Sequence, residues 1–482
     1  MRSVKNSYFK NGFRSILVKF EKATQHMKRV LHTLLLSCVL VLQSFSQYSW
    51  THVGTGADLG VQALRGDTTT NVLYLGGIFT TAGTLPTLGI AKWDGANYSA
   101  VGGGILTGVG ITSLFVDTNG DVVAGGTFTN IGGLLTKNIA RWNGSSWSAF
   151  GPGLDINVGL ASVNAIAKYN GEFYAGGTFT QAGSNPVSHV AKWDGANWQP
   201  LTSGTNGNVK ALCVYNNELY VGGTFTDAGG VTVSNIAKWN GVAWSDVGGG
   251  VNYTGAISVS AFQVFGGEIY AGGSFDHAGG VPVKHIAKWN GTSWSDPGGG
   301  ADYTGAISVS AFEVFHGELI AGGQFDSLGH VNCNFVGKWN GVNWTPMGLG
   351  MNAQVQTLAA VRDTLYAGGL FSTADSNPAL FIAQWQPNTL SVSYNSLSES
   401  DPIALYPNPV HNKLFIRVKG FAANEQIDLS LFDALGKEIL RKENVKDEVA
   451  FDRKNILPGL YVYKITDHKG TVLKQGKIVF TN

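Results

Sequence analysis

The sequence predicts an all-β fold: a seven-bladed β-propeller closed by its N-terminal strand, followed by a small C-terminal β-sandwich. Three observations lead to this prediction. A motif of two glycines, a variable residue and a phenylalanine occurs seven times at steps of 46–51 residues, each time followed by a tryptophan. Turn residues divide each repeat into four short segments, and a segment missing from the last repeat stands at the other end of the chain. A period near fifty residues marks stacked supersecondary units. The first glycines of the seven motifs are Gly76, Gly125, Gly176, Gly222, Gly272, Gly322 and Gly368.

The repeat at 163–204 shows how one unit is built. Alternating residues predict four strands, and an Asn-Gly and an Asp-Gly pair stand at two of the connections. These pairs favour the positive φ angles that two-residue hairpins need. Four antiparallel strands in about fifty residues are typical of one propeller blade. The segments in order are 163–169, Asn170-Gly171, 172–175, 189–193, Asp194-Gly195 and a strand around Trp198.

The two ends of the repeat region favour a closed ring over an open solenoid. Six repeats finish with an aromatic residue in a fourth strand, whereas the seventh runs from Trp385 into Pro387. Residues 50–54 match 244–248 and supply the missing strand. We therefore expect the N-terminal strand to complete the last blade, which leaves no free sheet edge.

The order of the motifs resembles the kelch-type propeller. Two glycines follow the second strand, one tryptophan ends the third strand and another opens the fourth, as in 220–226 and 235–241. The resemblance covers about residues 50–386. It implies a fold and leaves the function open, because propellers host many unrelated activities.

Length and charge limit the function classes. A chain of 482 residues exceeds one ordinary core and should hold more than one domain. Residues 47–400 contain twelve basic and twenty-one acidic residues, a net charge of −9. Nucleic-acid binding needs a basic surface, so we expect no nucleic-acid partner for the propeller at 47–386.

The first 46 residues are predicted to be an N-terminal extension that ends in a secretory signal peptide at 27–46. Met27 opens a basic stretch, 30–42 is mainly apolar, and small residues precede a cleavage site before Gln47. The apolar stretch is shorter than a stable membrane span. We expect the mature chain to have no transmembrane segment.

The character of the chain changes after the repeats. Residues 387–400 are polar and predict a linker, and 401–482 alternate as short strands with glycine turns, which predicts a small antiparallel sandwich. Four ordered motifs in this region contain Tyr406, Pro407, Asn408, Pro409, Gly436, Gly459 and Tyr461. In this order they resemble the C-terminal sorting domain of the type IX secretion system.

This second resemblance implies a route and a partner. It implies that the secretion machinery recognises 401–482 and exports the chain across the outer membrane of a Gram-negative bacterium. It also implies cleavage of the domain, with the cargo either released or attached to surface lipopolysaccharide. A signal peptide fits this route, because such cargo first crosses the inner membrane.

No residues assemble into a catalytic set in the sequence. The glycine pairs end strands and lack the helix and lysine of a phosphate-binding loop, so we expect them to permit close packing between blades. Kelch-type enzymes with copper need a cysteine partner, and neither Cys213 nor Cys333 has a suitable context; free thiols are expected. Calcium is the one cofactor left open, at loop aspartates that more often cap turns. These aspartates are Asp227, Asp276 and Asp326.

Topology selects a functional face. The turns between strands one and two and between strands three and four share one face, and we expect them to be too short to shape a pocket. The loops between strands two and three and between blades share the opposite face, are longer, and vary between repeats. Loops on a rigid scaffold commonly carry binding sites. The candidate ligand-binding residues in these loops are Tyr253, Tyr303, Asp302, Asp276, His277, Asp326 and His330, with Asp155 in an earlier loop.

The preferred function is that of a secreted or surface-anchored binding or adhesion propeller with a carbohydrate or protein ligand. Residues 253–262 recur unchanged as 303–312, which favours repetitive binding. Two alternatives stay open: a kelch-like extracellular enzyme acting on carbohydrate, and a structural component of the surface. Polar residues unique to one repeat and converging on the central channel would favour the enzyme.

Overall fold

The computed structural model describes residues 48–387 except 254, 256 and 304–306, and parts of 403–480 with gaps at 407–409, 411–412, 419–426, 434–435, 454–455, 458 and 469. The predicted signal peptide at 27–46 and residues 388–400 of the predicted linker lie outside the described residues. One compact unit comprises Tyr48–Pro387, and the described residues from 403 onward belong to another. The described residues are all-β, with strands and no helix.

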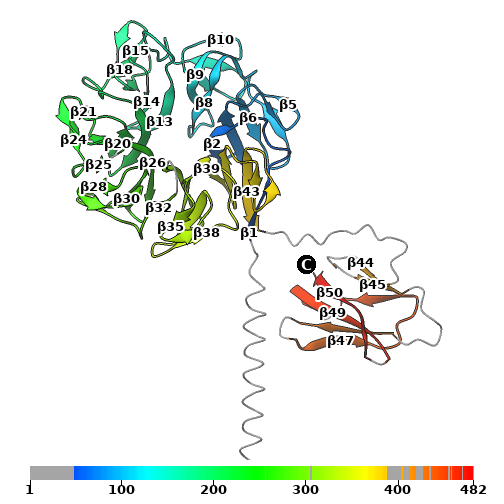
Figure 1. Cartoon of the computed structure of the whole chain (residues 1–482). Coiled ribbons are helices and arrows are strands. Elements are labelled where there is room, and N and C mark those ends of the chain that lie inside the picture. The colour runs from blue at the N-terminus through cyan, green and yellow to red at the C-terminus, as the bar shows by residue number, and fades with distance from the viewer. Residues whose placement is uncertain are drawn as a thin grey trace, which may run out of the picture. The chain divides into compact units, whose positions relative to one another are not determined.

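The larger unit has a β-propeller-like fold made of repeated antiparallel sheets (Figure 1). Within 48–387, seven sheets share one order, in which the first strand pairs with the second, the second with the third and the third with the fourth. The first strands are β2 (Val61–Asp67), β8 (Ile105–Val116), β13 (Val163–Tyr169), β19 (Val209–Tyr215), β26 (Ser258–Phe265), β33 (Ser308–Phe315) and β39 (Val355–Val361). The second strands are β3 (Val72–Gly77), β9 (Val122–Ile131), β14 (Glu172–Gly177), β20 (Glu218–Gly223), β27 (Glu268–Ser274), β34 (Glu318–Gln324) and β40 (Thr364–Gly369).

The outer half of each sheet is shorter. The third strands are β6 (Ile90–Trp93), β11 (Ile139–Trp142), β17 (Val190–Trp193), β23 (Ile236–Trp239), β30 (Ile286–Trp289), β37 (Val336–Trp339) and β43 (Ile382–Pro387). The fourth strands are β7 (Tyr98–Ala100), β12 (Trp147–Ala149), β18 (Trp198–Pro200), β24 (Trp244–Asp246), β31 (Trp294–Ser295), β38 (Trp344–Pro346) and, for the last sheet, β1 (Tyr48–His52).

The first strands lie around the centre of the ring of sheets in Figure 1. Each first strand packs against the first strand of the next sheet, and β2 packs against both β8 and β39. The first glycine of each Gly-Gly pair permits this approach. A Cβ added to Gly222 would lie 2.6 Å from Val259 of the next sheet, and one added to Gly368 would lie 2.7 Å from Val61. Both distances are too short for a real side chain, which explains the glycine.

Strand β1 occupies the fourth position of the last sheet. It pairs antiparallel with β43, with Trp50 opposite Trp385. The Trp50 indole donates a hydrogen bond to the Met347 carbonyl of the preceding sheet at 3.0 Å, just as Trp244 donates to the Leu201 carbonyl at 3.1 Å. The N-terminal strand therefore makes the same contacts between sheets as the fourth strands within the repeats.

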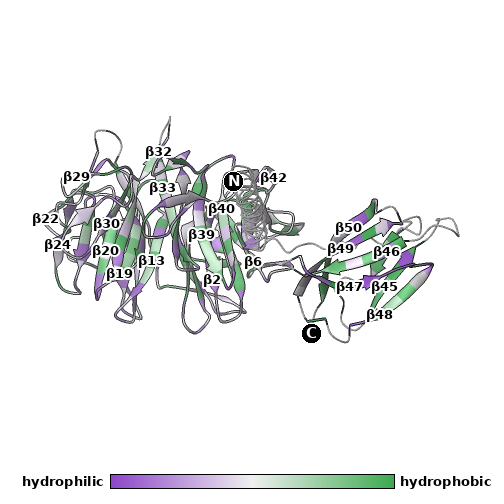
Figure 2. Cartoon of the chain, turned by 90° about the horizontal axis from the view of Figure 1, so that it is seen from below, coloured by the Kyte–Doolittle hydropathy of each residue, from purple (hydrophilic) through white to green (hydrophobic). Residues whose placement is uncertain are grey.

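Apolar packing between the sheets forms the core. Buried clusters combine residues of neighbouring sheets; one joins Trp50 and Val355 to Phe315. In Figure 2 the strands carry green, hydrophobic segments, and purple, hydrophilic segments gather at the turns. Because every sheet is covered on both faces by its neighbours, the scaffold is rigid and variation is left to the connections.

The turns between strands only partly follow the prediction. Asn170-Gly171 forms the expected two-residue turn, with φ angles of 51° and 83°. The Asp194-Gly195 connection is instead a four-residue turn, because Trp193 pairs with Trp198. The Asp194 carboxylate accepts the backbone N–H groups of residues 196 and 197, so the aspartate side chain stabilises a longer turn than the Asp-Gly pair suggests.

The connections between second and third strands contain small hairpins that the repeat pattern did not predict. In the fifth and sixth sheets the preceding inter-sheet segment adds a third strand to them. These short strands are β4 (Thr81–Ala82), β5 (Leu85–Pro86), β10 (Leu134–Leu135), β15 (Gln181–Ala182), β16 (Asn185–Pro186), β21 (Asp227–Ala228), β22 (Val231–Thr232), β25 (Val251–Asn252), β28 (His277–Ala278), β29 (Val281–Pro282), β32 (Ala301–Asp302), β35 (Ser327–Leu328), β36 (Val331–Asn332), β41 (Thr373–Ala374) and β42 (Asn377–Pro378).

The C-terminal unit consists of two antiparallel sheets around one apolar core. Leu414 and Ile416 of one sheet and Leu429, Leu431 and Ile465 of the other are buried together. The first sheet has the order β44 (Ile403–Tyr406), β45 (Lys413–Val418) and β48 (Glu448–Asp452), and the second β47 (Glu438–Lys442), β46 (Ile427–Phe432), β49 (Gly459–Asp467) and β50 (Val472–Phe480).

Candidate functional site

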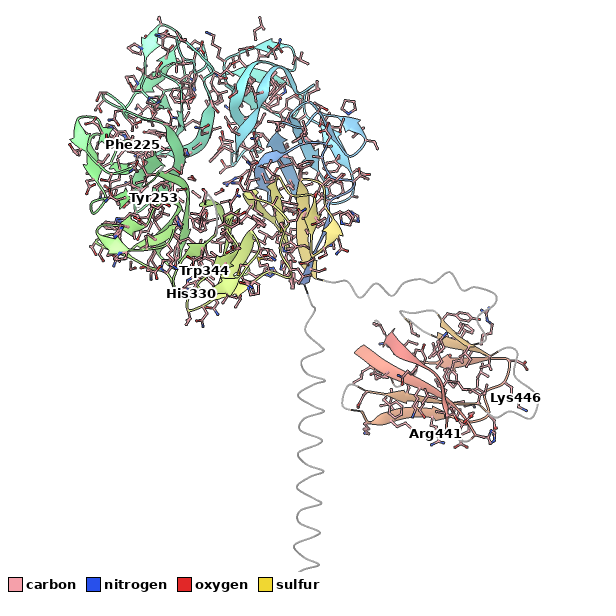
Figure 3. The ribbon with its side chains drawn as sticks, in the orientation of Figure 1. Phe225, Tyr253, His330, Trp344, Arg441 and Lys446 are labelled. Carbon is pink, nitrogen blue, oxygen red and sulfur yellow. The ribbon has the colours of Figure 1, made fainter. Side chains whose placement is uncertain are left out.

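The predicted loop residues fall into two neighbouring groups at the fifth and sixth sheets (Figure 3). The first group contains Tyr253, Asp276 and His277. Tyr253 follows β25, keeps 38% of its surface exposed, and packs edge-on against the His285 ring at 5.9 Å. The His277 Nδ1 atom lies 2.8 Å from the Asp276 carboxylate. The exposed Tyr253 ring therefore stands beside the His285 imidazole, and the strand pairing of Asn252 with His277 brings the Asp276–His277 pair into the same group.

The second group, one sheet later, keeps the tyrosine and an aspartate, Asp326, but has Asp302 and Ser327 where the first group has Asn252 and His277. Tyr303 packs against Phe335 at 6.3 Å, where Phe335 takes the place of His285. The Asp302 carboxylate accepts hydrogen bonds from Lys284 Nζ at 2.8 and 2.9 Å, and His330 Nδ1 lies 3.9 Å from it. The backbone N–H of Asp326 donates to the Asp302 carbonyl at 3.0 Å.

His285 shows that the two groups adjoin. Burial lowers the pKa of His285, while the negative charges of Asp276 and Asp302 act in the opposite direction. One imidazole is thus influenced by a carboxylate from each group. Asp155 belongs to neither: it lies in an earlier connection, where it forms an ion pair with Lys137.

The loop aspartates considered for calcium have local partners. Asp227 accepts the backbone N–H of Gly230 at 3.1 Å, and Asp326 accepts the Ser327 hydroxyl at 3.2 Å. Within the described ranges, no three His, Cys, Asp or Glu side chains converge as a metal ion requires. Of the three cysteines, Cys213 and Cys333 lie in the described residues and have free thiols, and burial raises the pKa of each to about 11.

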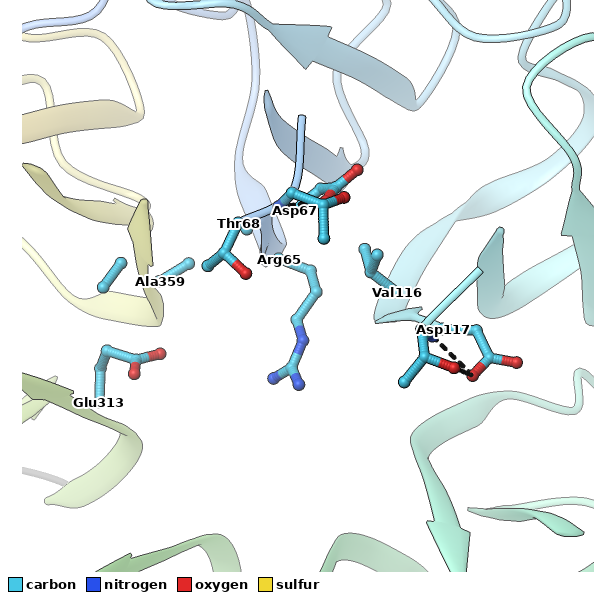
Figure 4. Close-up of a pocket in the computed structure, with 11 residues that line it drawn as sticks. Arg65, Asp67, Thr68, Val116, Asp117, Glu313 and Ala359 are labelled. Carbon is cyan, nitrogen blue, oxygen red and sulfur yellow. Dashed lines mark hydrogen bonds between the residues drawn. The ribbon is translucent and has the colours of Figure 1, made fainter. Parts of the chain in front are cut away.

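A pocket of about 420 Å³ lies on the other face, among the turns between first and second strands near the centre of the ring (Figure 4). The expectation that these turns are too short to shape a pocket is wrong for the first two sheets. Their turns are longer than two residues, because Asp67 pairs with Val72 and Val116 with Val122. The pocket is lined among others by Arg65, Asp67, Thr68, Asp117, Glu313 and Ala359.

These pocket residues were not predicted as site residues. The sequence does contain a signal for two of them, because Arg65 and Glu313 are charged residues at one shared position of the first strands. Other sheets have uncharged residues at this position, for example Ala167, Gln263 and Ala359. Aligning the repeats strand by strand would have exposed both charges.

The motif residues of the C-terminal unit support its fold. The Tyr406 ring stacks on Phe415 at 5.7 Å, and Tyr461 packs edge-on against Phe480 at 5.3 Å while its hydroxyl donates to a backbone carbonyl. Gly436 takes a φ of 77° in the turn after β46, which favours glycine. Pro407, Asn408 and Pro409 lie outside the described residues.

Residues 404–480 match the family model described as the secretion system C-terminal sorting domain. This match marks the chain for export by the type IX secretion system to the cell surface or the surroundings of a Gram-negative bacterium. No curated protein sequence matches the chain. In the parts of the chain that the structure describes, no helix has the length and apolar character needed to cross a membrane.

Two solved structures resemble the chain distantly. One is PorZ, a surface component of the type IX secretion system of Porphyromonas gingivalis, with 16% identity and a TM-score of 0.44; the match covers 89% of this chain and 60% of PorZ. The other is the WD40 β-propeller domain of Doa1, with 12% identity and a TM-score of 0.44, covering 71% of this chain and 97% of that domain. At this level of similarity neither structure carries functional information for this chain.

Proposed function

We propose that the chain is a secreted or surface-anchored binding protein whose 47–386 region forms a closed, kelch-like, seven-bladed propeller. The pairing of β1 with β43 and the approach of Gly368 to Val61 support closure, because both repeat contacts made between other sheets. The Gly-Gly and tryptophan pattern supports the kelch-like assignment. In this proposal 27–46 acts as the signal peptide, 387–400 as the linker and 401–482 as the sorting domain.

The ligand in this proposal is an extracellular glycan. It is held on the face formed by the connections between second and third strands and between sheets, here called the loop face. The carrying observation is that Tyr253 and Tyr303 occupy equivalent positions after β25 and β32, in loop groups that also contain the carboxylates Asp276 and Asp302. A tyrosine ring supplies an apolar face with a polar edge, which suits stacking against a sugar. The nearby carboxylates can accept hydrogen bonds from sugar hydroxyls. Two neighbouring groups, each with a tyrosine, favour a repetitive ligand through increased effective concentration.

A glycan array probed with the mature full-length protein tests this proposal. We expect binding to at least one glycan class, and we expect the double variant Tyr253→Ala/Tyr303→Ala to lose at least about 10-fold in affinity, the loss of one stacking contact or more. The matched control is Val242→Ala/Val342→Ala, since both valines are exposed in third-to-fourth strand turns on the other face.

The melting temperature of each variant shows that folding is intact. Wild-type affinity in the tyrosine variant, or equal loss in the valine control, would place binding elsewhere. If no glycan binds but a protein ligand does, and the tyrosine variant loses that binding, the ligand is a protein and the binding face stays as proposed.

A further inference from the structure

The pocket among the turns between first and second strands contains one cation, Arg65, which has no ion pair among the described residues. Arg65 projects into the open centre of the ring in Figure 4. Its guanidinium lies 5.8 Å from the centroid of the Phe115 ring, which favours a cation there and restricts its position. A planar, oriented guanidinium is the side chain best suited to bind a carboxylate through two parallel hydrogen bonds.

Two of the three carboxyl groups in the pocket already accept hydrogen bonds from neighbouring residues. Asp67 accepts hydrogen bonds from the backbone and hydroxyl groups of Thr69 at 2.9 and 2.6 Å. Asp117 accepts hydrogen bonds from Lys168 Nζ at 2.7 and 2.9 Å. For both aspartates burial acts to raise the pKa, but these hydrogen bonds prevail and lower it. Among the described residues, Arg65 forms an ion pair with neither of these carboxylates, and Asp117 is paired with Lys168.

Glu313 is the third carboxyl group, and it has a different environment. It comes from β33, and the small side chain of Ala359 on β39 separates it from Arg65 on β2. Burial raises the pKa of Glu313 to about 7, although the N–H of Val314 and the charge of Arg65 act to lower it. The side chain is surrounded by protein while still touching solvent in the centre of the ring. A neutral Glu313 can donate a hydrogen bond.

We propose that this pocket binds a small molecule with a carboxylate group, which Arg65 holds while Glu313 contacts a neighbouring polar group. This site is separate from the glycan site on the loop face and does not depend on it. The pocket has the volume expected for small-molecule sites, roughly 300–1,000 Å³. The same carboxylate chemistry occurs in acidic sugars and in amino acids, and the probes below distinguish these two sources.

Isothermal titration calorimetry of the mature full-length protein tests the proposal with three probes. D-Glucuronate carries a carboxylate on a sugar ring, D-glucose is its neutral counterpart, and L-glutamate carries carboxylates without a sugar. We expect glucuronate, glutamate or both to bind and glucose not to bind. Binding of glucuronate alone would identify an acidic sugar, and binding of glutamate alone an amino acid.

Variants then locate the site. Arg65→Gln should weaken carboxylate binding by at least about 10-fold, since it removes the charged partner. The matched control is Arg362→Gln, on the same face in the β39–β40 turn, where Arg362 contacts Asn71. The control and the loop-face variant Tyr253→Ala/Tyr303→Ala should keep wild-type affinity. Equal affinity in wild type and Arg65→Gln, equal binding of glucose, or no carboxylate binding at millimolar concentration would overturn the proposal.

The pH dependence gives a second readout. Wild-type binding should weaken from pH 6 to pH 8, because an ionised Glu313 adds a negative charge beside the ligand. No ionisable side chain lies on β26 or β39, the first strands that flank β33, and on its paired strand β34 Glu318 is held by Lys338 at 2.7 Å. Asp67 and Asp117, whose pKa values are lowered, stay ionised in this range. The affinity of Glu313→Gln should change little between pH 6 and pH 8. If its affinity instead weakens with pH as much as that of the wild type, Glu313 is not part of the site.

Discussion

A carboxyl group largely surrounded by protein ionises at a cost that the unfolded chain does not bear. Glu313 has a pKa of about 7 in the folded protein, against an ordinary value near 4.5, because burial disfavours its charged form. Between these values the folded state binds the extra proton more tightly than the unfolded state. Glu313 therefore lowers the free energy of unfolding as the pH rises from about 4.5 to about 7.

Replacing this glutamate should stabilise the protein at alkaline pH. At pH 5 wild type and Glu313→Gln should unfold at similar urea concentrations, and at pH 8 the variant should be more stable by about 1–3 kcal/mol. Gln263 at the equivalent position of the fifth sheet indicates that an amide fits. Urea unfolding at both pH values provides the measurement. Parallel pH profiles for the two proteins would show that Glu313 ionises freely.

Single residues also show where sequence reasoning reached its limit. The residue before each third strand is often asparagine or histidine, and the side chains of Asn138 and His285 each accept a backbone N–H. The structure adds that this residue has a positive φ in every sheet of 48–387, including Phe335 at 64° and Phe381 at 63°. The shared requirement is a left-handed backbone conformation, which asparagine tolerates. Phenylalanine rarely adopts it, so the residue type at Phe335 and Phe381 gives no signal for this conformation.

At the scale of the element, β1 connects the beginning and the end of the repeat region. Trp50 is fully buried, and its ring lies 5.3 Å from that of Trp385. Its backbone N–H donates to Asp375 at 2.7 Å. A strand of five residues therefore carries a large buried aromatic and hydrogen bonds to two sheets.

Removing residues 47–55 from the mature chain should destabilise the protein by several kcal/mol, the scale of losing a buried tryptophan. The deletion also exposes β43 as a free edge, so we expect concentration-dependent aggregation. Thr51→Ala, which keeps the strand, serves as the control and should unfold close to wild type. Thermal unfolding followed by calorimetry checks both, and an unchanged melting temperature in the deletion would contradict ring closure by β1.

Elements with a strong pattern were predicted well, and elements defined only by local hydrogen bonds were not. The strand at 163–169 was predicted from its alternating residues. The strand that pairs with the segment around Trp385 was predicted because the seventh repeat lacks a fourth strand. The small hairpin formed by β15 and β16 has two residues in each strand, too few to show a period. The longer turns after Asp67 and Val116 matter most for the candidate site, because they shape a pocket on the face where the turns were expected to be too short for one.

At the scale of the whole molecule, export depends on a unit that the ring does not need for its own packing. Deleting residues 401–482 should retain the protein in the periplasm, because the match to the sorting domain lies within this segment. The sheets of 48–387 contain no strand from it, so the truncated protein should keep its melting transition. Cell fractionation with protease accessibility measures the location. Normal surface exposure of the truncated protein would contradict the assigned route.

The position of β1 also bears on how such a chain evolves. The strand that completes the last sheet is encoded before the first repeat, so duplication or loss of whole repeats between the two ends leaves the joint with β43 intact. The identity of 253–262 and 303–312 is the trace expected of a recent duplication of this kind. Gene rearrangements could thus vary the number of binding loops without redesigning the connection between first and last sheets, within the curvature that the contacts between sheets allow.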